Sequence, residues 1–202
     1  MKKYLMILLL QSVVAAGFSQ TDTIMVFSKS YTAEGNKEYS KAIELMNSMY
    51  SQNSYSINLR LGWLWYLKGD YAKAQVYYKT AIAIEPKSIE ARLGYAFPVS
   101  AMENWLEVVN VYNEILIIDP NNSLINYKQA YIFFYIRKDY KAALTFISKV
   151  TKLYPFDFDA NYLTAQIQLS LGNIKEARNA AQSALEYNPQ SKEALKLFES
   201  LK

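Results

Sequence analysis

The fold is decided by residues 61–86, which read LGWLWYLKGDYAKAQVYYKTAIAIEP. A first apolar segment ends at Gly69, Asp70 follows as a favourable helix N-cap, and Ala74 lies on the buried face of a second helix. Pro86 then ends the second helix, because proline has no backbone N–H and disfavours helix in the residue before it. The stretch therefore predicts a helix, a tight turn, a second helix and a stop.

The same markers recur along the chain. Four prolines stand 34, 35 and 34 residues apart, an Asp or Asn stands sixteen residues before each, and a small residue follows that Asp or Asn four positions later. The prolines are Pro86, Pro120, Pro155 and Pro189, the caps are Asp70, Asn104, Asp139 and Asn173, and the small residues are Ala74, Val108, Ala143 and Ala177. A fixed period of this length predicts an array of helix pairs, in which each pair packs on its neighbours.

Residues 55–88 resemble the tetratricopeptide repeat. The family pattern is carried by Leu61, Gly62, Trp65, Gly69, Asp70, Tyr71, Ala74, Tyr78, Ala81 and Pro86. The resemblance implies an all-α, right-handed superhelical solenoid of helix-turn-helix repeats. The expected units are residues 23–54, 55–88, 89–122, 124–157 and 158–191, with Ser123 as a one-residue insertion. Residues 192–202 are expected to form a C-terminal capping helix that packs through Leu195 and Phe198.

Two segments depart from a regular helix pattern. Pro98 falls inside the first helix of the third unit, where a lost hydrogen bond predicts a kink but not loss of the unit. Residues 130–136 form an apolar run that a buried strand could also produce. The repeat period favours a helix there, because the run occupies the slot of a first helix.

Residues 1–19 have the pattern of a secretory signal peptide. Lys2 and Lys3 precede an apolar run from Tyr4 to Ala16, and small residues lead to a cleavage position before Gln20. The run is shorter than the roughly 18 residues expected of a spanning helix, although an uncleaved membrane anchor stays open as the alternative. We expect a periplasmic protein with no membrane insertion after cleavage. The leader and a composition rich in Lys, Ile, Asn and Tyr resemble exported repeat proteins of Bacteroidota.

Composition excludes several classes of function. The chain has no His and no Cys, which removes Ser-His-Asp and Cys-His catalysis, His or Cys metal sites and disulfides. Without the two leader lysines, 20 basic residues face 18 acidic ones, and no basic cluster suited to nucleic acid is present. The carboxylates Glu103, Glu107 and Glu114 fit a solvated helix surface. We therefore expect no enzyme, no catalytic residue, no cofactor and no nucleic-acid partner.

A calcium-loop pattern begins at Asp157 but does not continue. The order Asp157, Asp159 and Asn161 copies the first three ligand positions, yet Tyr162 replaces the turn glycine and Gln168 the bidentate glutamate. We expect Asp157 or Asp159 to cap the helix after Pro155 instead, and no metal site.

The family geometry implies a binding groove on the concave side. Positions 2, 5, 9, 12 and 13 of each first helix share one stripe at 100° per residue. The predicted groove residues are Leu59, Trp63, Tyr66, Leu93, Phe97, Lys128, Ile132, Tyr135, Tyr162 and Leu169. Tight curvature could instead pack these apolar side chains against one another.

Two functions follow from the sequence. The first is an exported, non-catalytic scaffold or adaptor that binds a protein or peptide segment, with Trp63 and Tyr135 as anchors. Its partner would be an outer-membrane or envelope-assembly component. The alternative is a module that binds cell-wall carbohydrate or peptidoglycan through flat, exposed rings of Trp63, Tyr66, Tyr135 and Tyr162.

Overall fold

The computed structural model describes residues 20–201. These residues form eleven α-helices and one π-helical segment, with no strand among them, so the predicted all-α fold is confirmed. The described chain divides into two compact units, one ending at Ser51 and one beginning at Gln52. The expected signal peptide lies outside the described residues. Across residues 20–201, no helix combines the length and the apolar character that crossing a bilayer requires.

The first unit contains one helix pair. Helix α1 spans Gln20–Gly35 and α2 spans Tyr39–Asn47. The turn between them contains Lys37 in the left-handed region at φ 61°. Ala42 of α2 is fully buried.

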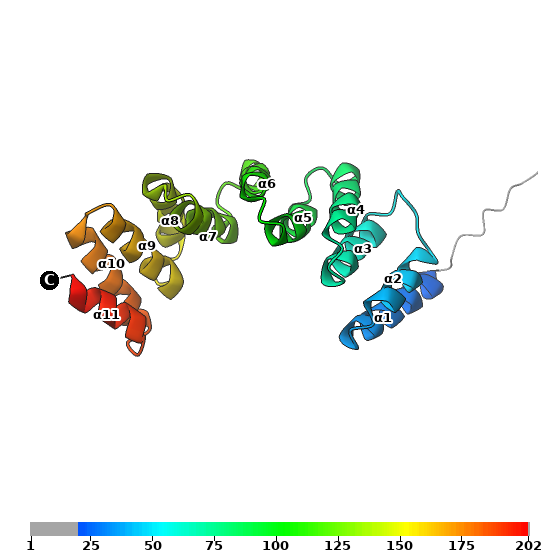
Figure 1. Cartoon of the computed structure of the whole chain (residues 1–202), viewed down its shortest axis with the longest axis horizontal. Coiled ribbons are helices and arrows are strands. Elements are labelled where there is room, and N and C mark those ends of the chain that lie inside the picture. Colours follow the sequence, from blue (N-terminus) through cyan, green and yellow to red (C-terminus); the bar gives the residue numbers. More distant parts are fainter. Residues whose placement is uncertain (1–19, 202) are drawn as a thin grey trace, which may run out of the picture. The chain divides into compact units, whose positions relative to one another are not determined.

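The second unit contains the other helices, each of which contacts its neighbours in sequence order (Figure 1). The elements are α3 (Tyr55–Leu67), α4 (Tyr71–Ile84), α5 (Ile89–Ala101), α6 (Trp105–Ile118), α7 (Ser123–Tyr131), η1 (Ile132–Ile136), α8 (Tyr140–Leu153), α9 (Phe158–Ser170), α10 (Ile174–Tyr187) and α11 (Lys192–Ser200). The run 130–136 is therefore helical, as the repeat period predicts, although most of it is a π-helix.

The predicted caps start the second helix of each pair. The Asp70 carboxylate accepts from Lys73 N at 3.1 Å and the Asp139 carboxylate from Ala142 N at 3.0 Å. Asn104 accepts from the third residue of α6 at 3.3 Å. Asn173 stands at the N-cap of α10 without a side-chain cap bond, and its amide donates to Gln168 Oε1 at 2.8 Å. Three of the four residues therefore act as predicted.

The turn before each cap uses the left-handed backbone region. Gly69 and Gly172 have φ of 86° and 79°, a conformation that glycine adopts without the penalty of a Cβ atom. Glu103 and Lys138 occupy the corresponding place in the other two turns at φ 57° and 55°. A side chain in this region is strained by roughly 1–2 kcal/mol, so these two turns store strain that glycine would remove.

The small side chains predicted at the close contacts are buried. Ala74, Val108, Ala143 and Ala177 are each fully inaccessible to solvent. The bulky residue three positions earlier is partly buried in three pairs, but Ile174 is 45% exposed. The buried face of α10 therefore begins at Ala177 and not at Ile174, as expected for an end of the array where fewer neighbours are available.

Two glycines hold one tyrosine ring between consecutive repeats. A Cβ atom added to Gly62 of α3 would lie 2.9 Å from Tyr78 Cγ, and one added to Gly94 of α5 would lie 2.7 Å from Tyr78 Cζ. Tyr78 of α4 is 2% exposed and belongs to the core cluster that also contains Tyr95 and Val99. The missing side chains are therefore what lets α3 and α5 both approach this ring.

Helix α5 continues past Pro98 to Ala101, so the third unit is retained as predicted. The kink at Pro98 stays a prediction.

The terminal helix packs differently from the sequence prediction. Leu195 is 43% exposed, whereas Ala194 and Leu201 are buried. Phe198 packs as predicted, under the Arg178 guanidinium, whose carbon lies 4.0 Å from the ring centre. Arg178 also donates to the carbonyl of Leu201 at 3.0 Å. The prediction for Leu195 was therefore wrong, because the terminal residues that pack into the hydrophobic cluster with α10 are Leu197, Phe198 and Leu201.

Candidate functional site

The predicted groove residues of α3 and α5 form one aromatic cluster. Trp63 and Phe97 meet edge to face with ring centres 6.0 Å apart, and Tyr66 stacks on Phe97 at 5.6 Å. Trp63 and Tyr66 are also neighbours at 5.6 Å. Leu59 and Leu93 pack beside them on the core, while Phe97 stays exposed. The structure thus joins these residues across two repeats into one partly exposed apolar surface.

The fourth unit has its additional residue inside the first helix. The N-caps of the first helices are Ser54, Ser88, Asn122, Asp157 and Ser191, so the 35-residue interval begins at Asn122. Ser123 is the first residue of α7. The π-helix from Ile132 to Ile136 takes up the additional residue, with Arg137 N donating to Ile132 O at 3.0 Å. The helix therefore widens at one turn.

This placement changes which residues of α7 share the stripe. When the residue after the Asn122 N-cap is counted as position 1, positions 5 and 9 are Tyr127 and Tyr131. The predicted Lys128 is half-buried and Ile132 is buried in the core. Tyr127 and Tyr131 were missed because the proline interval reports an additional residue but not its position. The Asn122 N-cap, 34 residues after Ser88, is the sequence signal that locates it.

Because the π-turn takes up the additional residue, Tyr135 lies on the same stripe as Tyr127 and Tyr131. The Tyr135 ring lies 4.5 Å from that of Tyr131, and its hydroxyl donates to Gln166 Oε1 of α9 at 2.8 Å. Tyr162 of α9 is half-buried and stacks on Phe158 at 5.9 Å, and Leu169 is exposed. We call the following set the first-helix stripe: Leu59, Trp63, Tyr66, Leu93, Phe97, Tyr127, Tyr131, Tyr135, Tyr162, Gln166 and Leu169.

An apolar cavity of about 420 Å³ lies beside this stripe between α5, α6 and α7. Its walls are mostly aromatic and aliphatic, with one charged residue, and consist of Ser100, Trp105, Tyr112, Leu124, Tyr127, Lys128, Tyr131 and Ile132. Burial raises the pKa of Tyr112 to about 12, so its hydroxyl is neutral at physiological pH. We call this space the apolar cavity.

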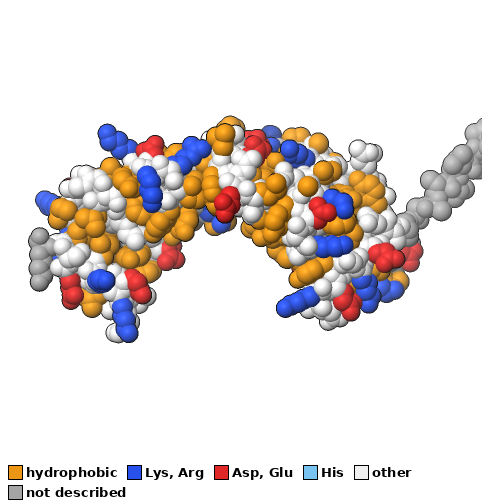
Figure 2. Space-filling model, in the orientation of Figure 1, with side chains coloured by type: hydrophobic (Ala, Val, Ile, Leu, Met, Phe, Trp, Pro, Cys, Tyr) orange, Lys and Arg blue, Asp and Glu red, His pale blue; other side chains and the backbone are white. Residues whose placement is uncertain are grey.

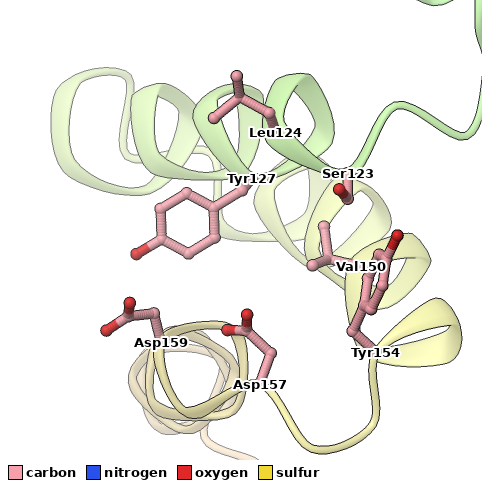
Figure 3. Close-up of a pocket in the computed structure, with 7 residues that line it drawn as sticks. All are labelled: Ser123, Leu124, Tyr127, Val150, Tyr154, Asp157 and Asp159. Carbon is pink, nitrogen blue, oxygen red and sulfur yellow. The ribbon is translucent and has the colours of Figure 1, made fainter.

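A second cavity of about 340 Å³ lies between α7, α8 and α9. It is lined by Ser123, Leu124, Tyr127, Val150, Tyr154, Asp157 and Asp159. Figure 3 shows both carboxylates at the start of α9 pointing toward α7, with the Tyr127 ring opposite them. Burial, and secondarily the charge of Asp159, raise the pKa of Tyr127 to about 12. We call this space the acidic cavity.

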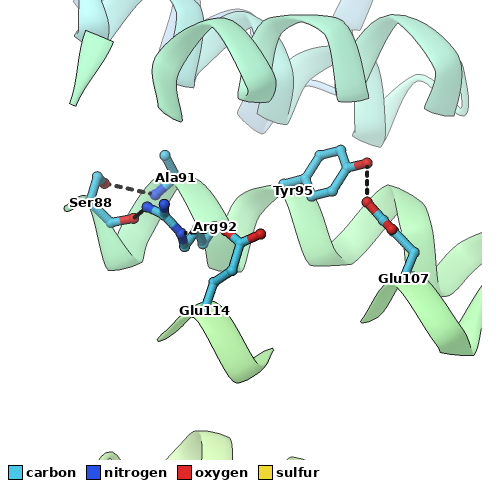
Figure 4. Close-up of polar contacts among 6 residues, drawn as sticks. All are labelled: Ser88, Ala91, Arg92, Tyr95, Glu107 and Glu114. Atoms are coloured by element: carbon cyan, nitrogen blue, oxygen red, sulfur yellow. Dashed lines mark hydrogen bonds and ion pairs between the residues drawn. The ribbon is translucent and has the colours of Figure 1, made fainter. Parts of the chain in front are cut away.

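Glu107 and Glu114, two of the carboxylates assigned to a solvated helix surface, serve separate structural contacts (Figure 4). Glu114 forms an ion pair with Arg92 at 2.9 Å, and Glu107 accepts from the Tyr95 hydroxyl at 3.0 Å. Glu103 lies in the turn before α6 and not on a helix. Both contacts connect α5 to α6, so Glu107 and Glu114 do more than face solvent.

Arg92 replaces an asparagine that other repeats use to close the turn before the first helix. The Asn126 and Asn161 amides each donate to the carbonyl of their N-cap residue, at 2.9 and 2.8 Å. Arg92 donates to the carbonyl of its own N-cap residue, Ser88, at 3.1 Å. The recurrence of Asn four residues after the N-cap was a usable sequence signal for this contact.

The calcium-like pattern forms a helix cap. The Asp157 carboxylate accepts from Ala160 N at 2.8 Å, and the Asn161 amide donates to the carbonyl of Pro155 at 2.9 Å. Among the residues that the structure describes, no three acidic side chains are grouped closely enough to hold a metal ion. The capping interpretation is confirmed for Asp157.

Hydrophobic and charged side chains are mixed on the visible surface. On the face of the second unit shown in Figure 2, orange hydrophobic side chains extend across the helices, with blue and red charges scattered among them. The exposed apolar residues of the first-helix stripe contribute Phe97, Tyr131, Tyr135 and Leu169 to the surface of the second unit.

Comparison with known proteins supports the repeat assignment. Residues 56–88 and residues 134–200 each match the tetratricopeptide repeat family. The chain is 31% identical over 115 residues to the protein ycf37 of Cyanophora paradoxa, whose own role is uncharacterised. That alignment covers 57% of this chain and 66% of the relative.

Solved structures share the fold at low sequence identity. A tetratricopeptide repeat protein from Parabacteroides merdae ATCC 43184 superposes with a TM-score of 0.75 at 17% identity, covering 90% of this chain and 72% of that one. The MamA protein gives 0.71 at 15% identity, covering 84% and 93%. YrrB, described as a repeat protein with an unusual peptide-binding site, gives 0.70 at 13% identity, covering 91% and 100%. The chain therefore carries tetratricopeptide repeats, and its helices have the fold of a tetratricopeptide-repeat solenoid.

Proposed function

We propose that this protein is a non-catalytic scaffold that binds a protein or peptide segment along the first-helix stripe. The observation that supports this most directly is the run of partly exposed aromatic side chains from α3 to α9. Phe97, Tyr131 and Tyr135 remain exposed although each has an aromatic neighbour within 6 Å. Exposed aromatic side chains are typical anchors of protein interfaces.

The rings are arranged for a partner with side chains of its own and not for a flat sugar. Trp63 and Tyr66 are half-buried, and their rings contact each other and Phe97. A sugar-binding platform needs an open ring face, whereas a peptide side chain inserts between tilted rings. YrrB, which shares the fold, is described by its peptide-binding site, and this supports the same class of ligand here.

The proposed location is the periplasm, with a partner in the outer membrane or its assembly machinery. The support is the leader pattern of residues 1–19. Intact-mass measurement of the protein from an envelope fraction tests this proposal, because cleavage leaves a chain that begins at Gln20. A full-length mass with detergent-dependent extraction would favour a signal anchor instead.

Photo-crosslinking in the native envelope tests the binding proposal. A photoreactive residue at Tyr131 lies on the stripe, and one at Tyr187 is a matched control because Tyr187 is also exposed but lies at the end of α10. We expect one dominant crosslinked partner from position 131 and none from position 187. Equal crosslinking at both positions would contradict binding along the stripe.

Truncation of the anchors gives the energetic test. Trp63→Ala and Tyr135→Ala should each weaken capture of the crosslinked partner by about 1–2 kcal/mol while the fold survives. Tyr187→Ala is the control, because its exposure of 42% is close to the 39% of Tyr135. Melting curves separate loss of binding from loss of fold. Wild-type capture by both anchor variants would move the binding site to another face.

A further inference from the structure

The apolar cavity and the acidic cavity share two wall residues, Leu124 and Tyr127. These residues lie three positions apart on one side of α7, so the two cavities adjoin at the same helical turn. We infer that the two cavities bind adjacent side chains of one peptide, an apolar or aromatic side chain in the first and a Lys or Arg side chain in the second. This inference rests on the proposed binding of a peptide segment.

The acidic cavity carries uncompensated negative charge. Asp157 and Asp159 are its only charged wall residues, and neither has an ion-pair partner among residues 20–201. Asp157 Oδ1 accepts from the α9 backbone, which leaves the other oxygen available. The positive end of α9 offsets roughly half a unit charge, so two carboxylates leave the site negative.

Aromatic walls complete a site for a cationic side chain. Tyr127 of α7 and Tyr154, the residue after α8, line the acidic cavity together with the aliphatic Leu124 and Val150. A long Lys or Arg side chain buries its methylene groups on such walls while its charged end meets a carboxylate or a ring face. A neutral or acidic side chain would leave the two negative charges uncompensated.

The apolar cavity has the opposite preference. Trp105, Tyr112 and Ile132 give it apolar walls, and its only charged wall residue is the half-buried Lys128. A basic ligand side chain would meet like charge there and no acid, whereas a Phe or Leu side chain would bury apolar area at about 25 cal/mol per Å². The charge difference between the cavities therefore fixes which peptide side chain enters which cavity.

A peptide array tests this assignment on the full chain. The probes are nine-residue Gly/Ser peptides in which Phe and Arg stand up to two residues apart in either order. Matched arrays replace Arg by Glu, Arg by Gln, or Phe by Ser. We expect the best Phe/Arg peptides to bind at least about tenfold more tightly than their Phe/Glu counterparts, with the difference shrinking as salt is raised.

Matched variants assign the effect to the two cavities. Asp157→Asn with Asp159→Asn removes both charges while Asn preserves the N-cap, and the preference for Arg over Gln should fall to less than about twofold. Asp139→Asn is the control, because Asp139 caps α8 in the same way but lines neither cavity. Tyr131→Ala should reduce the preference for Phe over Ser and leave that for Arg unchanged.

Two results overturn the inference, and each has a different meaning for the proposed function. If peptides bind but show no preference for Arg, or if the Asn variants retain it, the side-chain assignment is wrong while peptide binding stands. If no peptide in the array binds, the inference fails, and crosslinking at position 131 decides the proposed function independently.

Discussion

Gly94→Ala is expected to destabilise the protein although alanine is the better helix former. The new Cβ atom would lie 2.7 Å from Tyr78 Cζ and 2.8 Å from Tyr78 Cδ1, where about 3.5–4.0 Å is the optimal separation. The ring has little room to move, because Gly62 of α3 also lies against it: a Cβ atom added there would be 2.9 Å from Tyr78 Cγ. The overlap must therefore be relieved by moving α5 away from α4.

The expected size follows from two opposing terms. Replacing a helical glycine by alanine stabilises a helix by about 1 kcal/mol, and overpacking a filled core costs about 1–3 kcal/mol or more. Because the overlap at Gly94 is severe, we take the upper part of that range and expect a net loss of about 1–2 kcal/mol. Gly62→Ala, whose nearest ring atoms are at 2.9–3.0 Å, should lose less.

Urea denaturation followed by far-UV circular dichroism and tryptophan fluorescence measures the effect. The two signals together show whether the array unfolds as a whole or in parts. Tyr78→Leu removes the ring, and in that background Gly94→Ala should become neutral or stabilising. A coupling of at least about 1 kcal/mol between the two positions is expected. An unchanged or increased stability of Gly94→Ala with Tyr78 present would refute the close contact.

Further predictions concern the turns, Pro98 and a buried tyrosine. In thermal melts, Gly62→Leu should lower the melting temperature more than Pro98→Ala does, because it overpacks the Tyr78 contact by roughly 1–3 kcal/mol while Pro98→Ala restores a helical hydrogen bond. Lys138→Gly should raise the free energy of unfolding by up to about 1 kcal/mol, and Gly69→Ala should lower it by a similar amount, since both residues have positive φ. Burial raises the pKa of Tyr112 to about 12, whereas an unfolded tyrosine titrates near 10. The free energy of unfolding of the wild type should therefore fall as the pH rises from about 10 to about 12. At pH 11 the Tyr112→Phe variant should have lost about 1 kcal/mol less than the wild type. Opposite rankings in the melts, equal signs for the two turn variants, or parallel pH curves would contradict these three expectations in turn.

Local signals in the sequence predicted most of the fold because each repeat contains the residues that start and end its helices. Asp70 and Asp139 accept the backbone bonds that an N-cap must accept, and Gly69 adopts the left-handed conformation expected before a cap. These features depend on residues a few positions apart. A period in the sequence is therefore enough to place them.

The contacts that the sequence did not reveal depend on helices from different repeats or on where a helix widens. The Arg92–Glu114 ion pair joins α5 to α6 and occurs once, so the repeat period of the sequence does not predict it. The position of the additional residue in the fourth unit changes which tyrosines of α7 share the stripe. Tyr127 and Tyr131 are assigned to the stripe because Asn122 caps α7, a cap that the proline interval alone does not indicate.

The π-turn at Ile132–Ile136 also limits how far a change in chain length is transmitted. One more residue in a regular α-helix would rotate everything after it by about 100° and advance it by about 1.5 Å. In a solenoid such a rotation would displace every later helix, because each helix is positioned by the one before it. The wider turn confines the disturbance to a few residues: Asp139 N still closes the helix end on Phe133 O at 2.9 Å, and Asp139 still caps α8. The fourth unit therefore accommodates one more residue while α8 still begins at its cap and packs on α9.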